Sequence, residues 1–218
     1  HYTVFFTRKA RAKNIRLRID PSGNLLLTAP LFCRESQAVS FVTENLDWVE
    51  KQMKNLLKPR LFSDGETILL LGKEYMISHQ PTYKGGVCVQ GNQLIVGGEV
   101  SFLHRRITDY AKKIFYVYIQ NKAIAFAHLL NEKPHKITLR NTTSRWGSCS
   151  SQKNLNFCWK LAFAPQYVID YIVAHEVAHL KEMNHGPEFW KTVALLNVAQ
   201  ADAQIWLRKH GKEIQQIV

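Results

Sequence analysis

The stretch IVAHEVAHLKEMNHGPEFW, from Ile172 to Trp190, decides the fold. It contains H-E-x-x-H, a pattern in which two histidines one helical turn apart hold a zinc ion. Because residues i and i+4 share one face of a helix, His175 and His179 can direct both imidazoles at one ion. Apolar residues at helical spacing surround the motif: Val168, Ile169, Ile172, Val173, Val177 and Leu180. The segment therefore predicts a metal site on a largely buried helix.

Glu176 follows the first histidine and is rotated from it by about 100° around the helix axis. The residue therefore borders the metal-binding face without competing directly as a ligand. This position suits a general base that takes a proton from metal-bound water. A third protein ligand is expected as well, and three downstream residues are candidates: Glu182, His185 and Glu188.

The sequence favours His185 as the third ligand. On a continuous helix it would lie about 15 Å beyond His175, so the chain must leave the helix and return. Asn184 and Gly186 predict the end of that helix, and Pro187 predicts the first turn of the next one. Glu188 would then have a capping role beside the new helix dipole. Glu182 would lie about 10 Å along the axis, nearer the helix end than the ion.

The remaining chain predicts an α+β protein, because strands and one helix come first and helices with a small sheet follow. Strands are expected at 14–19 and 25–30, on both sides of Gly72, in a hairpin about Gly91, and in three short runs between 136 and 158. Helices are expected at 36–57, 102–130 and 201–210, and from Pro165 and Pro187 onward. A boundary near Gly98 divides a β-rich region, 1–98, from a catalytic domain, 99–218.

The chain has 29 Lys and Arg against 17 Asp and Glu, a net charge of +12. This excess allows an anionic partner such as nucleic acid or a nucleotide. Six cations near the N-terminus contain no acid among them: Arg8, Lys9, Arg11, Lys13, Arg16 and Arg18. Because no aromatic residue interleaves with them, a solvated strand face is the simpler interpretation. The four cysteines form no C-x-x-C pair and no apolar run could span a bilayer, which favours a cytoplasmic protein.

The segment from Arg145 to Trp190 closely resembles the YgjP-like metallopeptidases, relatives of the SprT-like and WLM zinc peptidases in the zincin superfamily. The marks are R-W-G-S-C-S, H-E-x-x-H, N-H and F-W, in this order and spacing. The resemblance implies a compact zincin-like helical core preceded by a β-rich part. It also implies one Zn²⁺ per chain held by His175, His179 and His185, with Glu176 as the catalytic base.

The expected activity is hydrolysis of peptide bonds in a peptide or protein substrate. Four residues are candidate substrate contacts: Arg145, Trp146, Gly147 and Tyr171. The segment around Gly147 looks like an edge strand, which could pair with an extended substrate. Arg145 and Tyr171 could donate to the oxyanion, although a packed aromatic is the simpler interpretation of Tyr171. Zinc-dependent hydrolysis of nucleotide phosphoanhydrides and a nucleic-acid-associated protein with a zinc site are the alternative functions.

Overall fold

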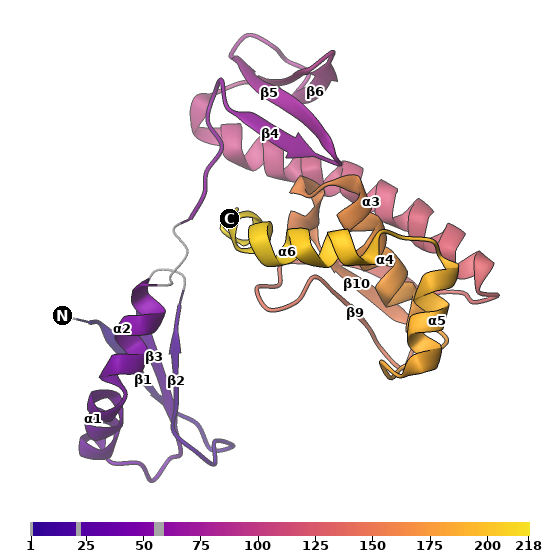
Figure 1. The fold of residues 1–218 in the computed structure, drawn as a ribbon. Helices are drawn as coiled ribbons and strands as arrows, with labels where there is room; N and C mark the ends of the chain where they lie inside the picture. Colours follow the sequence, from indigo (N-terminus) through magenta and orange to yellow (C-terminus); the bar gives the residue numbers. More distant parts are fainter. Residues whose placement is uncertain (1, 21–22, 55–58) are drawn as a thin grey trace. The chain divides into compact units, whose positions relative to one another are not determined.

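The computed structural model describes residues 2–20, 23–54 and 59–218. The chain divides into two compact units, His1–Pro59 and Arg60–Val218 (Figure 1). The strands of the first unit are β1 (Val4–Arg8), β2 (Arg16–Ile19) and β3 (Leu25–Ala29), and its helices are α1 (Glu35–Glu44) and α2 (Leu46–Lys54). The strand order is β1-β3-β2, with β1 parallel and β2 antiparallel to β3.

One face of this first sheet forms a small core with α1. The alternation of β2 and β3 turns Leu17 and Leu27 into that core, where they join Ala38 and Phe41 of α1. The single helix expected at 36–57 is divided at Asn45, whose side-chain amide donates to the carbonyl oxygen of Phe41 at 2.7 Å. Its predicted end lies outside the described residues. Strand β1 has no counterpart among the predicted elements.

The second unit begins with a four-stranded sheet of order β4-β5-β7-β6. Its strands are β4 (Thr67–Leu70), β5 (Lys73–Gln80), β6 (Val87–Gln90) and β7 (Gln93–Gly97). The strand pair around Gly72 and the hairpin about Gly91 are confirmed. The compact units divide at Pro59, and this sheet packs into the same hydrophobic core as the helices that follow. The boundary near Gly98, with a catalytic domain at 99–218, stays a prediction.

The long helix α3 (Leu103–Leu129) follows a 3-10 turn, Val100–Phe102, and runs through the centre of the second unit (Figure 1). Buried residues recur along it at intervals of four: Leu103, Ile107, Ala111, Phe115, Ile119, Ala123 and Ala127. This stripe packs against α4 (Gln166–Ala178), the helix that bears H-E-x-x-H. Asp170 of α4 also accepts from Lys122 at 3.0 Å and from the Tyr118 hydroxyl at 2.5 Å, which fixes the two helices together.

A three-stranded sheet, order β8-β10-β9, lies beside α4. Its strands are β8 (Lys136–Arg140), β9 (Gly147–Cys149) and β10 (Asn154–Cys158), and a 3-10 turn at Trp159–Phe163 leads to α4. Helices α5 (Pro187–Leu195) and α6 (Gln200–Gln215) complete the unit. The three strands and the α+β class, with a helical core, a small sheet and a β-rich N-terminal part, are confirmed.

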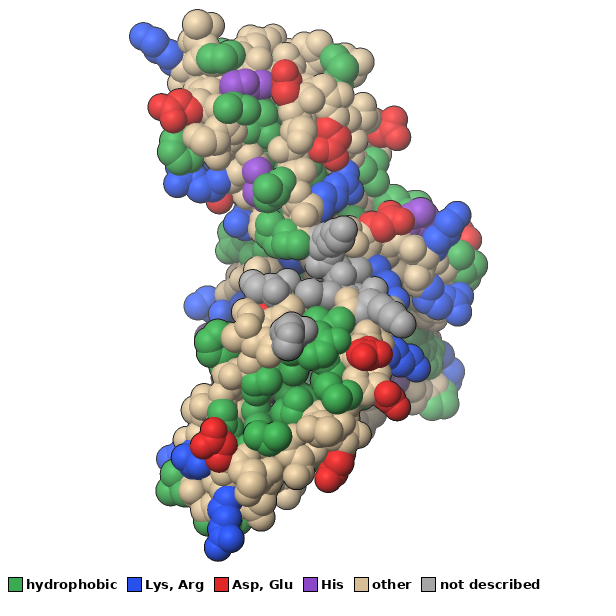
Figure 2. Space-filling view, turned by 90° about the vertical axis from the view of Figure 1, so that its left-hand side faces the viewer, with side chains coloured by type: hydrophobic (Ala, Val, Ile, Leu, Met, Phe, Trp, Pro, Cys, Tyr) green, Lys and Arg blue, Asp and Glu red, His purple; other side chains and the backbone are tan. Residues whose placement is uncertain are grey.

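The surface of the first unit exposes several large apolar side chains. Figure 2 shows hydrophobic side chains gathered on this unit, in the lower part of that view. The most exposed of them is Phe32, at 84% of its full area. Among the helices that the structure describes, none has both the length and the apolar composition needed to cross a membrane.

Candidate metal centre

Helix α4 ends at Ala178, earlier than the sequence predicts. His175 lies in its last turn and His179 is its C-cap residue. The chain turns at once, because the amides of Lys181 and Glu182 both donate to the carbonyl of Ala178. The predicted helix end at Asn184 is wrong, and Asn184 is not among the residues with a left-handed backbone. The turn nevertheless brings the chain back toward α4, so that His185 lies beside His175 and His179, as predicted.

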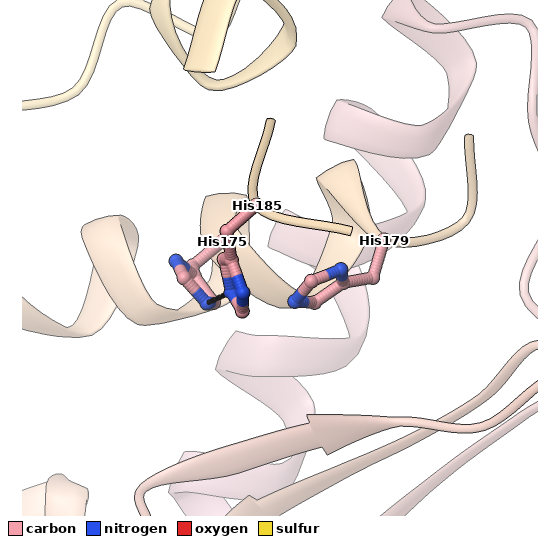
Figure 3. A group of neighbouring side chains, drawn as sticks. All are labelled: His175, His179 and His185. Carbon is pink, nitrogen blue, oxygen red and sulfur yellow. Dashed lines mark hydrogen bonds between the residues drawn. The ribbon is translucent and has the colours of Figure 1, made fainter. Parts of the chain in front are cut away.

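The three histidines converge at the end of α4 (Figure 3). One ring nitrogen from each of His175, His179 and His185 lies within 4.8 Å of the other two. The Nε2 atoms of His175 and His185 are 3.1 Å apart. Two nitrogens bound to one tetrahedral zinc at about 2.0–2.1 Å would lie about 3.3 Å apart, close to this separation. The geometry therefore fits a shared metal ion.

Contacts behind the rings support the same conclusion. The Nδ1 atom of His179 lies 2.9 Å from the carbonyl oxygen of Glu182, so Nδ1 holds the proton and Nε2 is left for a metal. Phe189 of α5 is fully buried, and its ring centroid lies 4.5–4.9 Å from those of all three histidines. The Nδ1 atom of His175 is buried with no partner among the described residues. These contacts leave Nε2 of His175 as the atom that faces the cluster.

The electrostatics of the cluster favour neutral imidazoles. Burial, followed by the charges of His179 and His185, lowers the pKa of His175 to about 4. Burial also lowers the pKa of His179. A metal needs a free lone pair on each ring, so low histidine pKa values make these two nitrogens available at neutral pH.

The two competing ligands have other roles. Glu188, in the first turn of α5, forms an exposed ion pair with Lys191 at 2.7 Å, on the helix that Pro187 begins. Glu182 contributes its backbone carbonyl to His179, as described above. Neither carboxylate belongs to the group of side chains that could hold the metal.

Glu176 is the buried acid beside this cluster. Its side chain lines the same pocket as His175 and is 6% exposed. Burial raises the pKa of Glu176 to about 8, while the guanidinium of Arg145 acts in the opposite direction. A divalent cation nearby would also favour the ionised form. The carboxyl group is thus held where it can exchange a proton with a molecule in the pocket.

Strand β9 packs closely against Glu176. A Cβ atom added to Gly147 would lie 2.5 Å from both Cγ and Oε1 of Glu176, far inside contact distance. The absence of a side chain at Gly147 therefore makes room for the catalytic candidate itself. The sequence predicts that Gly147 contacts a substrate, and no local sequence signal identifies Glu176 as its neighbour.

The pocket in front of Glu176 has a volume of about 440 Å³. Arg145, Trp146, Gly147 and Tyr171, the four predicted substrate contacts, all line it. Helix α6 adds three residues that the sequence does not predict: Gln204, Leu207 and Arg208. Gln204 donates to the hydroxyl of Tyr171 at 2.8 Å, so the buried Tyr171 ring is packed and its hydroxyl is oriented.

A family model for the YgjP-like metallopeptidase domain matches residues 13–210, across both compact units. The chain belongs to this family. A crystal structure of the metallopeptidase zymogen of Pyrococcus abyssi abylysin is 18% identical, over 46% of this chain and 99% of that one, with a TM-score of 0.38. That similarity is too weak to transfer residue roles. A search of curated proteins finds no match.

The contact between Gly147 and Glu176 makes a prediction for this YgjP-like domain. Gly147→Ala should reduce peptide hydrolysis by about 100-fold, because displacing a reacting group by about 1 Å can cost that much. Metal content should stay unchanged, since the three atoms nearest to the added methyl group all belong to Glu176. Turnover and bound metal are measured on the same preparation. Gly186→Ala is the matched control, because a Cβ there meets nothing within 4 Å. Equal losses of turnover in both variants would contradict the role given to the contact between Gly147 and Glu176.

Proposed function

We propose that this YgjP-like protein is a zinc-dependent metallopeptidase. In this proposal, His175, His179 and His185 hold one Zn²⁺ and Glu176 is the general base. The observation that carries the proposal is the convergence of three imidazoles, one of which, His175, lines the same pocket as the buried Glu176. Within the described ranges no fourth His, Cys, Asp or Glu joins the group. A structural zinc site would usually be closed by such a fourth ligand.

The chemistry divides between the ion and the side chains. When bound, Zn²⁺ would polarise the scissile carbonyl and make water more acidic. Glu176 takes the proton from the attacking water and returns it to the departing amine. Its burial keeps bulk water from competing for that proton. The candidate donors to the developing oxyanion are Tyr171 and Arg145, which both line the pocket. The hydroxyl of Tyr171 accepts a hydrogen bond from Gln204, so its own hydrogen is free to donate.

The substrate is proposed to bind as an extended strand along β9. This strand is at the edge of its sheet, because its described partner is β10 alone. An edge strand presents unpaired backbone groups to which a peptide can add. Trp146 and Gly147 lie where this edge meets the pocket. Binding there would place a peptide carbonyl in front of Glu176.

The test uses the purified full chain loaded with Zn²⁺. We expect cleavage within a pool of proteome-derived peptides, loss of cleavage after chelation, and recovery when one equivalent of Zn²⁺ is restored. Nucleoside triphosphates are assayed in parallel. Turnover of nucleotides without turnover of peptides would replace the proposal by phosphoanhydride hydrolysis. A cytoplasmic location remains a prediction.

A further inference from the structure

The open face of the N-terminal sheet gathers charges that the metal centre does not use. Phe6, Leu17 and Leu27 point into the core with α1, so their neighbours along each strand point to the opposite face. Residues paired across strands project to the same side. The register therefore places two cross-strand rows on the open face: Phe5, Leu26 and Arg18, then Thr7, Thr28 and Arg16.

The loop between β1 and β2 extends this face and hollows it. A concavity of about 570 Å³ lies over Leu26 and Thr28. Five cations line it: Lys9, Arg11, Lys13, Arg16 and Arg18. All five are exposed, and none of the described residues that line the concavity is acidic. We call these five residues the basic face.

Arg8 differs from the five residues of the basic face, because its guanidinium makes structural contacts within the first unit. Its Nε donates to the carbonyl of Cys33 at 2.9 Å, and its guanidinium lies 4.8 Å from the centroid of the Phe6 ring. Arg8 is thus used on the core side of the sheet. The basic face, in comparison, concentrates like charges without a carboxylate in the concavity, and an anionic ligand would relieve their repulsion.

An aromatic side chain borders the basic face. Phe5 is 52% exposed and shares a cross-strand row with Leu26 and Arg18. A sheet that offers an exposed aromatic ring beside a cationic groove matches the way proteins bind single-stranded nucleic acid. Phosphates meet the cations, and an unstacked base lies on the ring. A duplex would leave Phe5 without a partner, because its bases are already stacked.

We propose that the open face of the N-terminal sheet binds single-stranded nucleic acid, with the basic face contacting phosphates and Phe5 stacking on a base. This activity is separate from the metal centre and does not depend on the proposed peptidase function. Its failure would leave the assignment of the three histidines unaffected.

The first experiment measures binding of a labelled oligothymidylate to the full chain across a salt series. The triple variant R11Q/R16Q/R18Q should bind at least about tenfold more weakly at low salt. The slope of log K against log salt should fall by about 2, since each single-strand phosphate contact contributes about 0.7. The control K73Q/K84Q/K133Q removes equal charge from exposed sites of the second unit. Equal losses in both triples, or no binding by the unaltered chain, would overturn the proposal.

The second experiment separates stacking from charge. Phe5→Ala should weaken binding severalfold without changing the salt slope, because base stacking involves no counterion release. Phe32→Ala is the control, since this ring is 84% exposed but lies outside the cross-strand rows of the open face. Duplex DNA, polyglutamate and a mononucleotide are measured alongside. Tighter binding of any of these three than of the oligothymidylate would replace single-stranded nucleic acid as the ligand.

Discussion

Glu176→Gln is expected to abolish peptide hydrolysis while zinc stays bound. The amide has nearly the same shape as the carboxyl group but cannot take a proton from water, and a general base contributes about 10²–10⁴ in rate. The histidines keep their geometry, because the amide side chain of the variant would still occupy the space opposite Gly147. Turnover of a peptide found in the screen and zinc content by elemental analysis are the two measurements.

A matched control for this variant is Glu188→Gln. Glu188 also follows closely on a metal-ligand candidate, but it is exposed and paired with Lys191. Its replacement should leave turnover within about twofold of the unaltered chain, because exposed ion pairs contribute little. Full activity in the Glu176 variant would show that another group takes the proton.

His185→Ala should remove the metal. Loss of an outer partner alone weakens a metal site by about 10- to 100-fold, so loss of a direct ligand should exceed about 100-fold. Two nitrogens would remain, on His175 and His179, and neither neighbouring glutamate is part of the cluster. Competition with a chelator of known affinity measures the change.

The control for this second variant is His128→Ala, an exposed histidine at the end of α3. Its zinc affinity should equal that of the unaltered chain. Should the His185 variant instead retain zinc at unchanged affinity, the third ligand would pass to Glu182 or Glu188. A chain with His185→Ala and either glutamate replaced would then identify it.

The sequence predicts the candidate metal ligands because their spacing is local. His175 and His179 lie one helical turn apart, and Pro187 predicts the start of the helix that follows His185. The predicted end of α4 is wrong because the amides of Lys181 and Glu182 both donate to the carbonyl of Ala178 and form a turn there. No residue type in this segment predicts that turn. The candidate ligands are therefore predictable even where the backbone that positions them is not.

The walls of the pocket depend on contacts between distant parts of the chain. Gln204, Leu207 and Arg208 come from α6, and Gly147 meets Glu176 across the interface between β9 and α4. Periodicity and motif spacing describe only neighbours along the chain, so they cannot reveal such pairs. The same limit applies to Phe5, the aromatic residue that borders the basic face. Phe5 precedes the cations in sequence, and only the parallel pairing of β1 with β3 places it beside them.

One stretch of backbone, β9, serves two purposes in the proposed enzyme: it receives the peptide and it packs against the general base. Evolution of a new substrate preference through β9 would therefore disturb the proton transfer at the same time. On helix α6, Gln204 is constrained in a similar way because it orients Tyr171, whereas Leu207 and Arg208 line the pocket with no such role in the proposed mechanism. Differences in substrate choice among related peptidases should accordingly accumulate at Leu207 and Arg208, while position 147 stays glycine.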